Sequence, residues 1–272
     1  MNLPGFIDPA IMTASLSEYD TNPLALYLFK LYGQFLSPEQ IIGVMRSYNV
    51  GCARYMSGST VWWQVDMQGR VRTGRVISYD NDSGSTTGGN VEWVHNLLCN
   101  RYPSFSPRHC FFGSHLLADA HPDCRILLFE NEKDALMVAL IAKAAGSDLD
   151  KMIIPIACPS ITDFNFSTYN AISSLSPMRA LRDRCVNIIP SHENYARWFT
   201  CSLAVPETYA SVRVSPILTP ELRPSWLRYT TGGIEEIIVN LLHDRSCRPV
   251  HLADFLLNLY YGYCPVRDFI PA

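Results

Sequence analysis

The sequence has no long hydrophobic run. Its longest uninterrupted apolar stretch, residues 135–142, covers eight positions, whereas a membrane-spanning helix needs about 20. The first twenty residues, Met1 to Asp20, have no basic start followed by an apolar segment, so we expect no signal peptide. These two absences favour a cytoplasmic protein that makes no contact with a membrane.

Charged residues are scarce, and neither sign dominates. They make up 17% of the chain against 48% hydrophobic residues, and the net charge is −3. A disordered chain has the opposite balance, so this composition predicts a packed protein. A protein that holds duplex nucleic acid by charge alone is usually basic, because its affinity comes from neutralised phosphates. Any nucleic-acid-binding surface on this chain is therefore expected to be a local patch.

Paired metal-ligand spacings are also missing. The nine cysteines are scattered and include no Cys-x-x-Cys pair, which argues against a disulfide framework and against a structural zinc site. We expect most of these thiols to behave as small core residues. Four histidines lie in the middle of the chain, but their spacings fit no pair of ligands on one helix face: His95, His109, His115 and His121.

The N-terminal part of the chain is predicted to be a small α+β module. Residues 1–20 show no periodicity and are expected to form an irregular arm. Helices are expected at 23–31 and from Pro38 onward, where Ser37 and Gln40 have the spacing of a capping box. Three strands are expected at 50–56, 60–66 and 70–79, a loop at 80–90 and a short helix at 91–99.

Strands and helices then alternate. Strands are expected at 125–129, 152–157, 186–189 and 211–215, with helices at 131–145 and 192–203. Strands separated by helices imply a parallel sheet with right-handed crossovers. Two amphipathic helices, at 233–243 and 250–260, close the chain. The predicted fold class is α/β, divided into an N-terminal module (1–120), an α/β core (121–215) and a C-terminal helical cap (216–272).

One acidic motif lies where a strand is expected to end and a helix to begin. Glu130 follows the apolar run 125–129, and Asp134 comes four residues later. Ligands of open α/β sheets bind at the carboxyl ends of the strands. Solvated acidic residues are also common in a first helical turn, where the helix dipole favours them. The position therefore makes Glu130 a candidate site residue without defining its chemistry.

The motif and several other segments resemble a known family. Residues 127–135 are similar to the first motif of the Toprim domain, in which a strand ends in a glutamate and an aspartate follows four residues later. Further segments resemble uncharacterised, primase-like proteins of bacterial mobile elements: 48–51, 61–66, 69–74, 93–95 and 110–117. The resemblance implies a Toprim-like parallel sheet, a role in DNA replication or maintenance of a mobile element, and Mg²⁺ as a possible cofactor.

Several positions depart from that family pattern. Asn131 replaces the customary glycine, and residues 158–160 replace a Gly-Gly turn. Ser191 stands where the first aspartate of an Asp-x-Asp motif is expected, so only Glu193 could represent the second. A hydroxyl is a weak Mg²⁺ ligand beside a carboxylate. We therefore expect Glu130 to mark a vestigial catalytic site, with Asp134 and Glu193 as its candidate metal ligands, and we expect this site to hold no metal.

A second candidate surface combines basic and aromatic residues. Arg70, Arg72 and Arg75 lie on an expected strand beside the one that carries Trp62, and Arg54 is nearby. In a strand Arg70 and Arg72 share a face and Arg75 points to the other. Such residues can stack bases and neutralise phosphates. The alternative is that the tryptophan is core and the arginines only hydrate the sheet.

Three functional hypotheses remain open from the sequence. The first is a primase-related protein with impaired or lost metal-dependent catalysis, which binds single-stranded nucleic acid or replication proteins. The second is an active Mg²⁺-dependent phosphoryl-transfer enzyme of primase or nuclease type. The third is a protein-binding scaffold without catalysis. Metal dependence separates the second from the others, and salt-sensitive binding of single-stranded DNA separates the first from the third.

Overall fold

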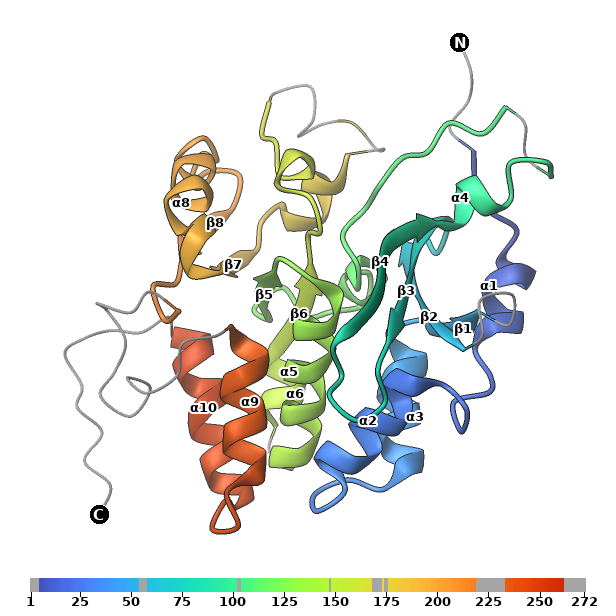
Figure 1. Ribbon diagram of the computed structural model, residues 1–272. Helices are drawn as coiled ribbons and strands as arrows, with labels where there is room; N and C mark the ends of the chain where they lie inside the picture. The colour runs from blue at the N-terminus through green and yellow to red at the C-terminus, as the bar shows by residue number, and fades with distance from the viewer. Residues whose placement is uncertain are drawn as a thin grey trace.

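The computed structural model describes residues 5–53, 58–101, 104–146, 148–167, 173, 176–218 and 233–261. Two four-stranded sheets organise this part of the chain (Figure 1). The first is antiparallel with the order β1-β2-β3-β4, and the second is parallel with the order β6-β5-β7-β8. The chain is thus mixed α/β with a parallel sheet flanked by helices, which is the fold class that the sequence predicts.

The antiparallel sheet contains the three strands expected from the alternating pattern. Its strands are β1 (Val50–Ala53), β2 (Ser59–Val65), β3 (Val71–Tyr79) and β4 (Thr86–Trp93). Every residue of β2 is buried. One face packs toward the parallel sheet, and the other covers a smaller cluster that contains Val61, Trp63 and Val71. A strand that is buried on both faces has few side chains that a ligand from solvent can contact.

Three helices precede this sheet. α2 (Pro23–Tyr32) and α3 (Pro38–Ser47) are confirmed, and the predicted capping box joins Ser37 and Gln40. The expectation of an irregular N-terminal arm is wrong, because α1 occupies Pro9–Ser15. Asp8 caps it and Pro9 takes its first position, but no residue of α1 is buried, so its sequence carries no apolar periodicity.

The sequence prediction for 80–99 is wrong in two places. The loop expected at 80–90 is confirmed for residues 80–85, but residues 86–90 belong to β4, whose Thr86 and Thr87 pair with β3. The helix expected at 91–99 is confined to α4 (Val94–Leu97). The segment is rich in residues typical of turns, and Gly88 and Gly89 have positive φ. This segment is nevertheless a strand because its backbone hydrogen-bonds to β3. The sequence of β4 does not reveal that pairing.

The parallel sheet matches the predicted strands within one or two residues. It consists of β5 (Arg125–Phe129), β6 (Ile153–Ala157), β7 (Cys185–Ile189) and β8 (Ser211–Val214). β5 is central, with β6 on one side and β7 on the other. Short helical segments and α8 (Tyr195–Leu203) connect the strands: η2 (Ser114–Leu117), α6 (Leu149–Met152), η3 (Ile161–Asp163), η4 (Pro177–Leu181) and η5 (His192–Asn194).

α5 (Glu132–Ala145) is the central helix of the molecule. Twelve of its fourteen residues are buried, because it packs against β5 and β6, α3, and the C-terminal pair α9 (Ile234–His243) and α10 (Pro249–Tyr261). In Figure 1 the C-terminal pair lies beside α5. The largest core cluster joins residues from all three predicted segments. The segment boundaries at 120 and 215 stay a prediction.

Candidate functional site

Glu130 lies at the carboxyl end of the central strand β5, as the sequence predicts. Both of its carboxylate oxygens accept hydrogen bonds from N–H groups. The backbone N–H of Ser191, just beyond β7, donates to Oε2 at 2.6 Å, and the indole Nε1 of Trp198 on α8 donates to Oε1 at 2.9 Å. Trp198 is itself buried, at 1% exposure. Glu130 therefore ties the ends of two strands to the following helix.

A cavity of about 260 Å³ opens beside Glu130. Its wall consists of the segment after β6 (158–162) together with Asn194, Arg197 and Trp198. The polar groups are one carboxylate, one guanidinium, an amide and the hydroxyls of Ser160 and Thr162. Arg197 is exposed at the cavity and adds a positive charge beside the partly exposed carboxylate of Glu130. The cavity is thus suited to a polar ligand with an anionic group that Arg197 can hold.

The three predicted metal ligands are not gathered into one site. Asp134 is bonded to Asn131, which accepts from its backbone N–H and donates to its Oδ2 at 2.6 Å. Glu193 lies in η5 and is exposed. Among the residues that the structure describes, no three His, Cys, Asp or Glu side chains are placed to hold a metal ion. Glu130, Asp134 and Glu193 therefore do not fit the carboxylate set expected for Mg²⁺.

Asp134 has an unusual electrostatic environment. Burial raises its pKa to about 7, while the Asn131 hydrogen bond opposes that rise. Glu235 on α9 and Glu130 raise the pKa further, and Lys133 lowers it. Like charges and desolvation both disfavour the carboxylate form. Asp134 thus titrates close to neutral pH.

Arg75 joins the antiparallel sheet to the helix α5 instead of facing solvent. Its Nη1 donates to both carboxylate oxygens of Glu132 in the first turn of α5, at 3.1 and 2.8 Å. The side chain of Glu132 is 2% exposed and that of Arg75 is 18% exposed. Burial raises the pKa of Glu132, and Arg75 opposes this shift. The guanidinium is therefore committed to an internal ion pair.

Arg70 and Arg72 share one face of the chain, as predicted, and both turn toward Asp66. Their Nε atoms donate to Oδ2 of Asp66 at 2.8 and 2.6 Å, and both guanidinium groups lie over the ring of Phe6. Arg72 is 2% exposed. This arrangement corrects the expected solvent-facing position of Arg72, which is buried. Arg70 keeps a 34% exposed side chain, and both cations share the single carboxylate of Asp66 near the β2–β3 turn.

Trp62 belongs to the core. It has no exposed surface, its indole N–H donates to the hydroxyl of Tyr79, and its ring meets Phe112 edge-on at 5.4 Å. The expectation that Trp62 stacks a base is corrected by this burial, which leaves no ring face for a ligand. Arg54, the last member of the predicted patch, lies outside the described residues.

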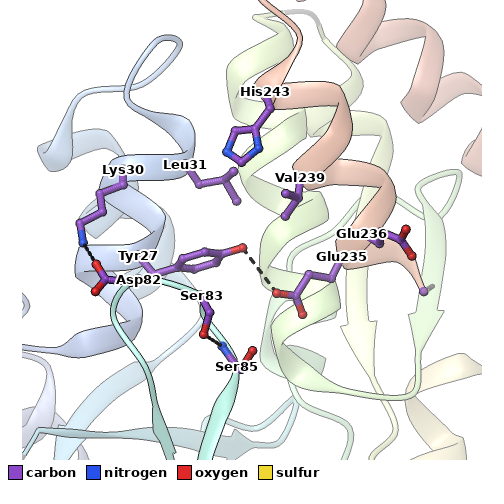
Figure 2. Close-up of a pocket in the computed structure, with 11 residues that line it drawn as sticks. Tyr27, Lys30, Leu31, Asp82, Ser83, Ser85, Glu235, Glu236, Val239 and His243 are labelled. Atoms are coloured by element: carbon purple, nitrogen blue, oxygen red, sulfur yellow. Dashed lines mark hydrogen bonds and ion pairs between the residues drawn. The ribbon is translucent and has the colours of Figure 1, made fainter. Parts of the chain in front are cut away.

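A larger cavity, of about 530 Å³, lies on a different part of the molecule (Figure 2). α2, the β3–β4 turn and α9 surround it with side chains that include Tyr27, Lys30 and Glu235. Three of its charged residues have protein partners, since Lys30 pairs with Asp82 and Glu235 pairs with the buried ammonium of Lys133. These pairs tie α5 and α2 to their neighbours, so we regard this cavity as a structural junction.

Sequence reasoning missed Asn194, Arg197 and Trp198. All three lie at or near the start of α8, but only the fold brings that helix to the end of β5. Their spacing, at i, i+3 and i+4, does place them on one helix face. That spacing could have indicated a common surface, although its partner Glu130 is more than sixty residues away.

Two solved structures are similar to this chain at low identity. The primase fragment of the bacteriophage T7 primase-helicase protein is 14% identical, with a TM-score of 0.43 over 78% of this chain and 72% of that chain. The RNA polymerase domain of Mycobacterium tuberculosis primase DnaG is 12% identical, with a TM-score of 0.45 over 93% of this chain and 96% of that chain. Similarities this weak carry no argument about function.

A search of curated proteins found no match. A protein-family model matches residues 22–190, which is more than half of the chain and runs from the start of α2 to the end of β7. The matched range includes both sheets except β8, and it contains Glu130 and its acidic neighbours. The chain therefore belongs to the family described as a domain of unknown function, DUF6371.

Proposed function

We propose that this protein is a primase-related, non-catalytic nucleic-acid-binding protein that acts in the cytoplasm, in replication or maintenance of a mobile element. The observation that carries the proposal is the state of Glu130. Both oxygens of this carboxylate accept hydrogen bonds from N–H groups of the protein. A carboxylate engaged in this way positions the loop and helix beside it, and among the described residues it belongs to no group of three side chains that could hold a metal ion.

The cavity next to Glu130 supplies the binding chemistry. Arg197 is exposed at its edge, and an arginine can hold a phosphate with two parallel hydrogen bonds. The amide of Asn194 and the hydroxyls of residues 160 and 162 add neutral polar contacts. The net charge of −3 also favours local contact over non-specific binding along the whole surface.

Binding of a fluorescent single-stranded oligonucleotide, measured by anisotropy over a range of salt concentrations, tests this function. We expect salt-sensitive binding by the wild type, and Arg197→Gln should weaken it and reduce the slope of log K against log salt by about 0.7 for one lost phosphate contact. Arg182→Gln is the matched control, because Arg182 is also exposed but precedes the amino end of β7. No binding by the wild type, or an equal loss in the control, would overturn the proposal.

Calorimetry with Mg²⁺ and Mn²⁺ separates this function from the enzyme alternative. We expect no binding at millimolar metal by the wild type or by Glu130→Gln, because no carboxylate set surrounds Glu130 in the described structure. Binding by the wild type that vanishes in Glu130→Gln would instead support a working metal site and metal-assisted phosphoryl transfer.

A further inference from the structure

Four aromatic rings form a cluster where the antiparallel sheet approaches the cavity. They are Trp93 at the end of β4, His95 on α4, and Phe105 and His109 from the segment that follows. The rings of Trp93 and His109 meet at 4.5 Å, and those of His95 and Phe105 stack at 5.7 Å with an interplanar angle of 18°. All four residues are half-buried, so each ring is packed on the protein and partly exposed to solvent.

Two buried side chains of the sheet hold the imidazoles in place. Thr73 Oγ1 lies 2.7 Å from Nδ1 of His95, and Gln64 Oε1 lies 3.2 Å from Nδ1 of His109. Gln64 Oε1 is an acceptor, so Nδ1 of His109 must donate to it. The Nε2 atom of the neutral His109 ring is then a hydrogen-bond acceptor. Burial lowers the pKa of both imidazoles, which favours this neutral form.

Trp93 has no role in the core that would account for it. It belongs to none of the hydrophobic clusters found among the described residues, and its ring contacts are the two imidazoles. Within the same part of the chain its indole N–H has no hydrogen-bond partner. The partly exposed ring of Trp93 therefore offers an aromatic face at the surface that is not committed to the core.

A cation lies beside the cluster. Arg108 precedes His109, is exposed, and forms no ion pair with any residue that the structure describes. The cluster also adjoins the cavity at Glu130, because Asp163 lies within electrostatic reach of His109 while its neighbours Ile161 and Thr162 line the cavity. η3 therefore belongs both to the cavity wall and to the surroundings of His109.

We propose that this aromatic cluster binds single-stranded nucleic acid, with one base against Trp93 and the adjacent phosphate on Arg108. The inference rests on the proposed function and extends its site from the cavity to a second surface. Stacking on aromatic rings beside a cation suits a strand whose bases are unpaired, because a base inside a duplex has no free face. The in-plane indole N–H of Trp93 takes no part in that stacking, and the acceptor Nε2 of His109 is left for another polar group of the strand. The two imidazoles pack against Trp93 and extend the aromatic surface around it.

The test measures the affinity of the full chain for a short single-stranded oligonucleotide. We expect Trp93→Ala and Arg108→Gln each to weaken binding about tenfold or more, and Trp93→Phe to restore most of the affinity. Tyr261→Ala is the matched control, because Tyr261 is 63% exposed on the C-terminal helix α10. Thermal unfolding of each variant checks that the fold is retained, and the duplex of the same sequence is expected to compete weakly.

The outcomes separate this inference from the proposed function. One outcome is that the wild type binds and Arg197→Gln weakens binding, while Trp93→Ala and Arg108→Gln bind like the wild type. The inference about the aromatic cluster is then overturned, and the cavity remains the proposed binding site. If Trp93→Ala loses affinity and Arg197→Gln does not, the inference stands and the cavity is not the site. Equal competition by the duplex would contradict stacking of an unpaired base. If the wild type binds no nucleic acid, both the proposed function and this inference are overturned.

Discussion

At the scale of single residues, Asp134 gives this protein a pH-dependent stability. Its pKa is raised to about 7 in the folded protein by burial, whereas an aspartate in an unfolded chain titrates near 4. Between these two values the folded state binds more protons than the unfolded state. The contribution of Asp134 to the free energy of unfolding therefore rises as pH falls through 7, and it is fully present only below the unfolded pKa.

Asp134→Asn is expected to remove that dependence. Urea unfolding at mildly alkaline, neutral and mildly acidic pH should show the wild type gaining stability on acidification relative to the variant. Asp148→Asn is the control with the opposite sign, because the exposed Lys151 lowers the pKa of Asp148. A pH profile of Asp134→Asn that parallels the wild type would show that Asp134 titrates in its ordinary range.

At the scale of secondary-structure elements, Asn187 fixes the C-terminal helix to the parallel sheet. This β7 residue is 2% exposed, and its Nδ2 donates to the backbone carbonyls of Leu259 and Tyr260 at 3.0 and 2.7 Å. The last carbonyls of a helix have no partner within the helix. Arg125 supports the same contact, since it lies over the ring of Tyr260 at 4.5 Å. The side-chain amide of Asn187 therefore makes the hydrogen bonds that hold the end of α10 to β7.

Asn187→Leu should loosen α10 without unfolding the sheet. The loss of two hydrogen bonds to buried carbonyls is expected to cost roughly 1–3 kcal/mol. Hydrogen exchange should accelerate in the last turn of α10 more than in β5. Asn258→Ala is the control on the same helix, because the half-buried Asn258 donates to the backbone carbonyl of Asp254 within its own helix. Unchanged exchange in α10 would mean that apolar packing alone docks the helix.

At the scale of the whole molecule, the Arg75–Glu132 pair connects the antiparallel sheet to the central helix α5. A buried pair contributes little net stability compared with apolar residues of similar size. Removal of one partner, however, leaves an uncompensated charge. The stability of the contact between the antiparallel sheet and α5 is therefore expected to fall more when either residue is lost alone than when both are replaced together.

A double-mutant cycle tests this connection. Arg75→Met and Glu132→Leu are each expected to lower the free energy of unfolding by about 3–5 kcal/mol, and the double variant by less than the sum of the two. The exposed pair Lys30–Asp82 is the control, for which a coupling of about 0–1 kcal/mol is expected. If the losses of unfolding free energy at Arg75 and Glu132 were additive, the pair would not couple the antiparallel sheet to α5.

The sequence alone determined the features that depend on neighbours along the chain. The capping box of Ser37, the strand at 125–129 and the helix that follows it were all predictable, because hydrogen bonds and apolar periodicity within a few residues define them. The position of Glu130 at the carboxyl end of a parallel strand followed from the same local pattern. Its role as a candidate catalytic residue stays a prediction.

Only the tertiary structure decided what these side chains contact. Trp62 and Arg72 are buried because another layer of the fold covers their faces, and Arg75 is neutralised by a residue 57 positions away. The strand β4 exists because β3 pairs with it, although its own residues favour turns. Local propensity sets the backbone of a segment, but the exposure and charge state of its side chains depend on partners distant in sequence. For that reason the sequence located the carboxyl end of β5, and only the fold assembled the cavity and the ring cluster beside it.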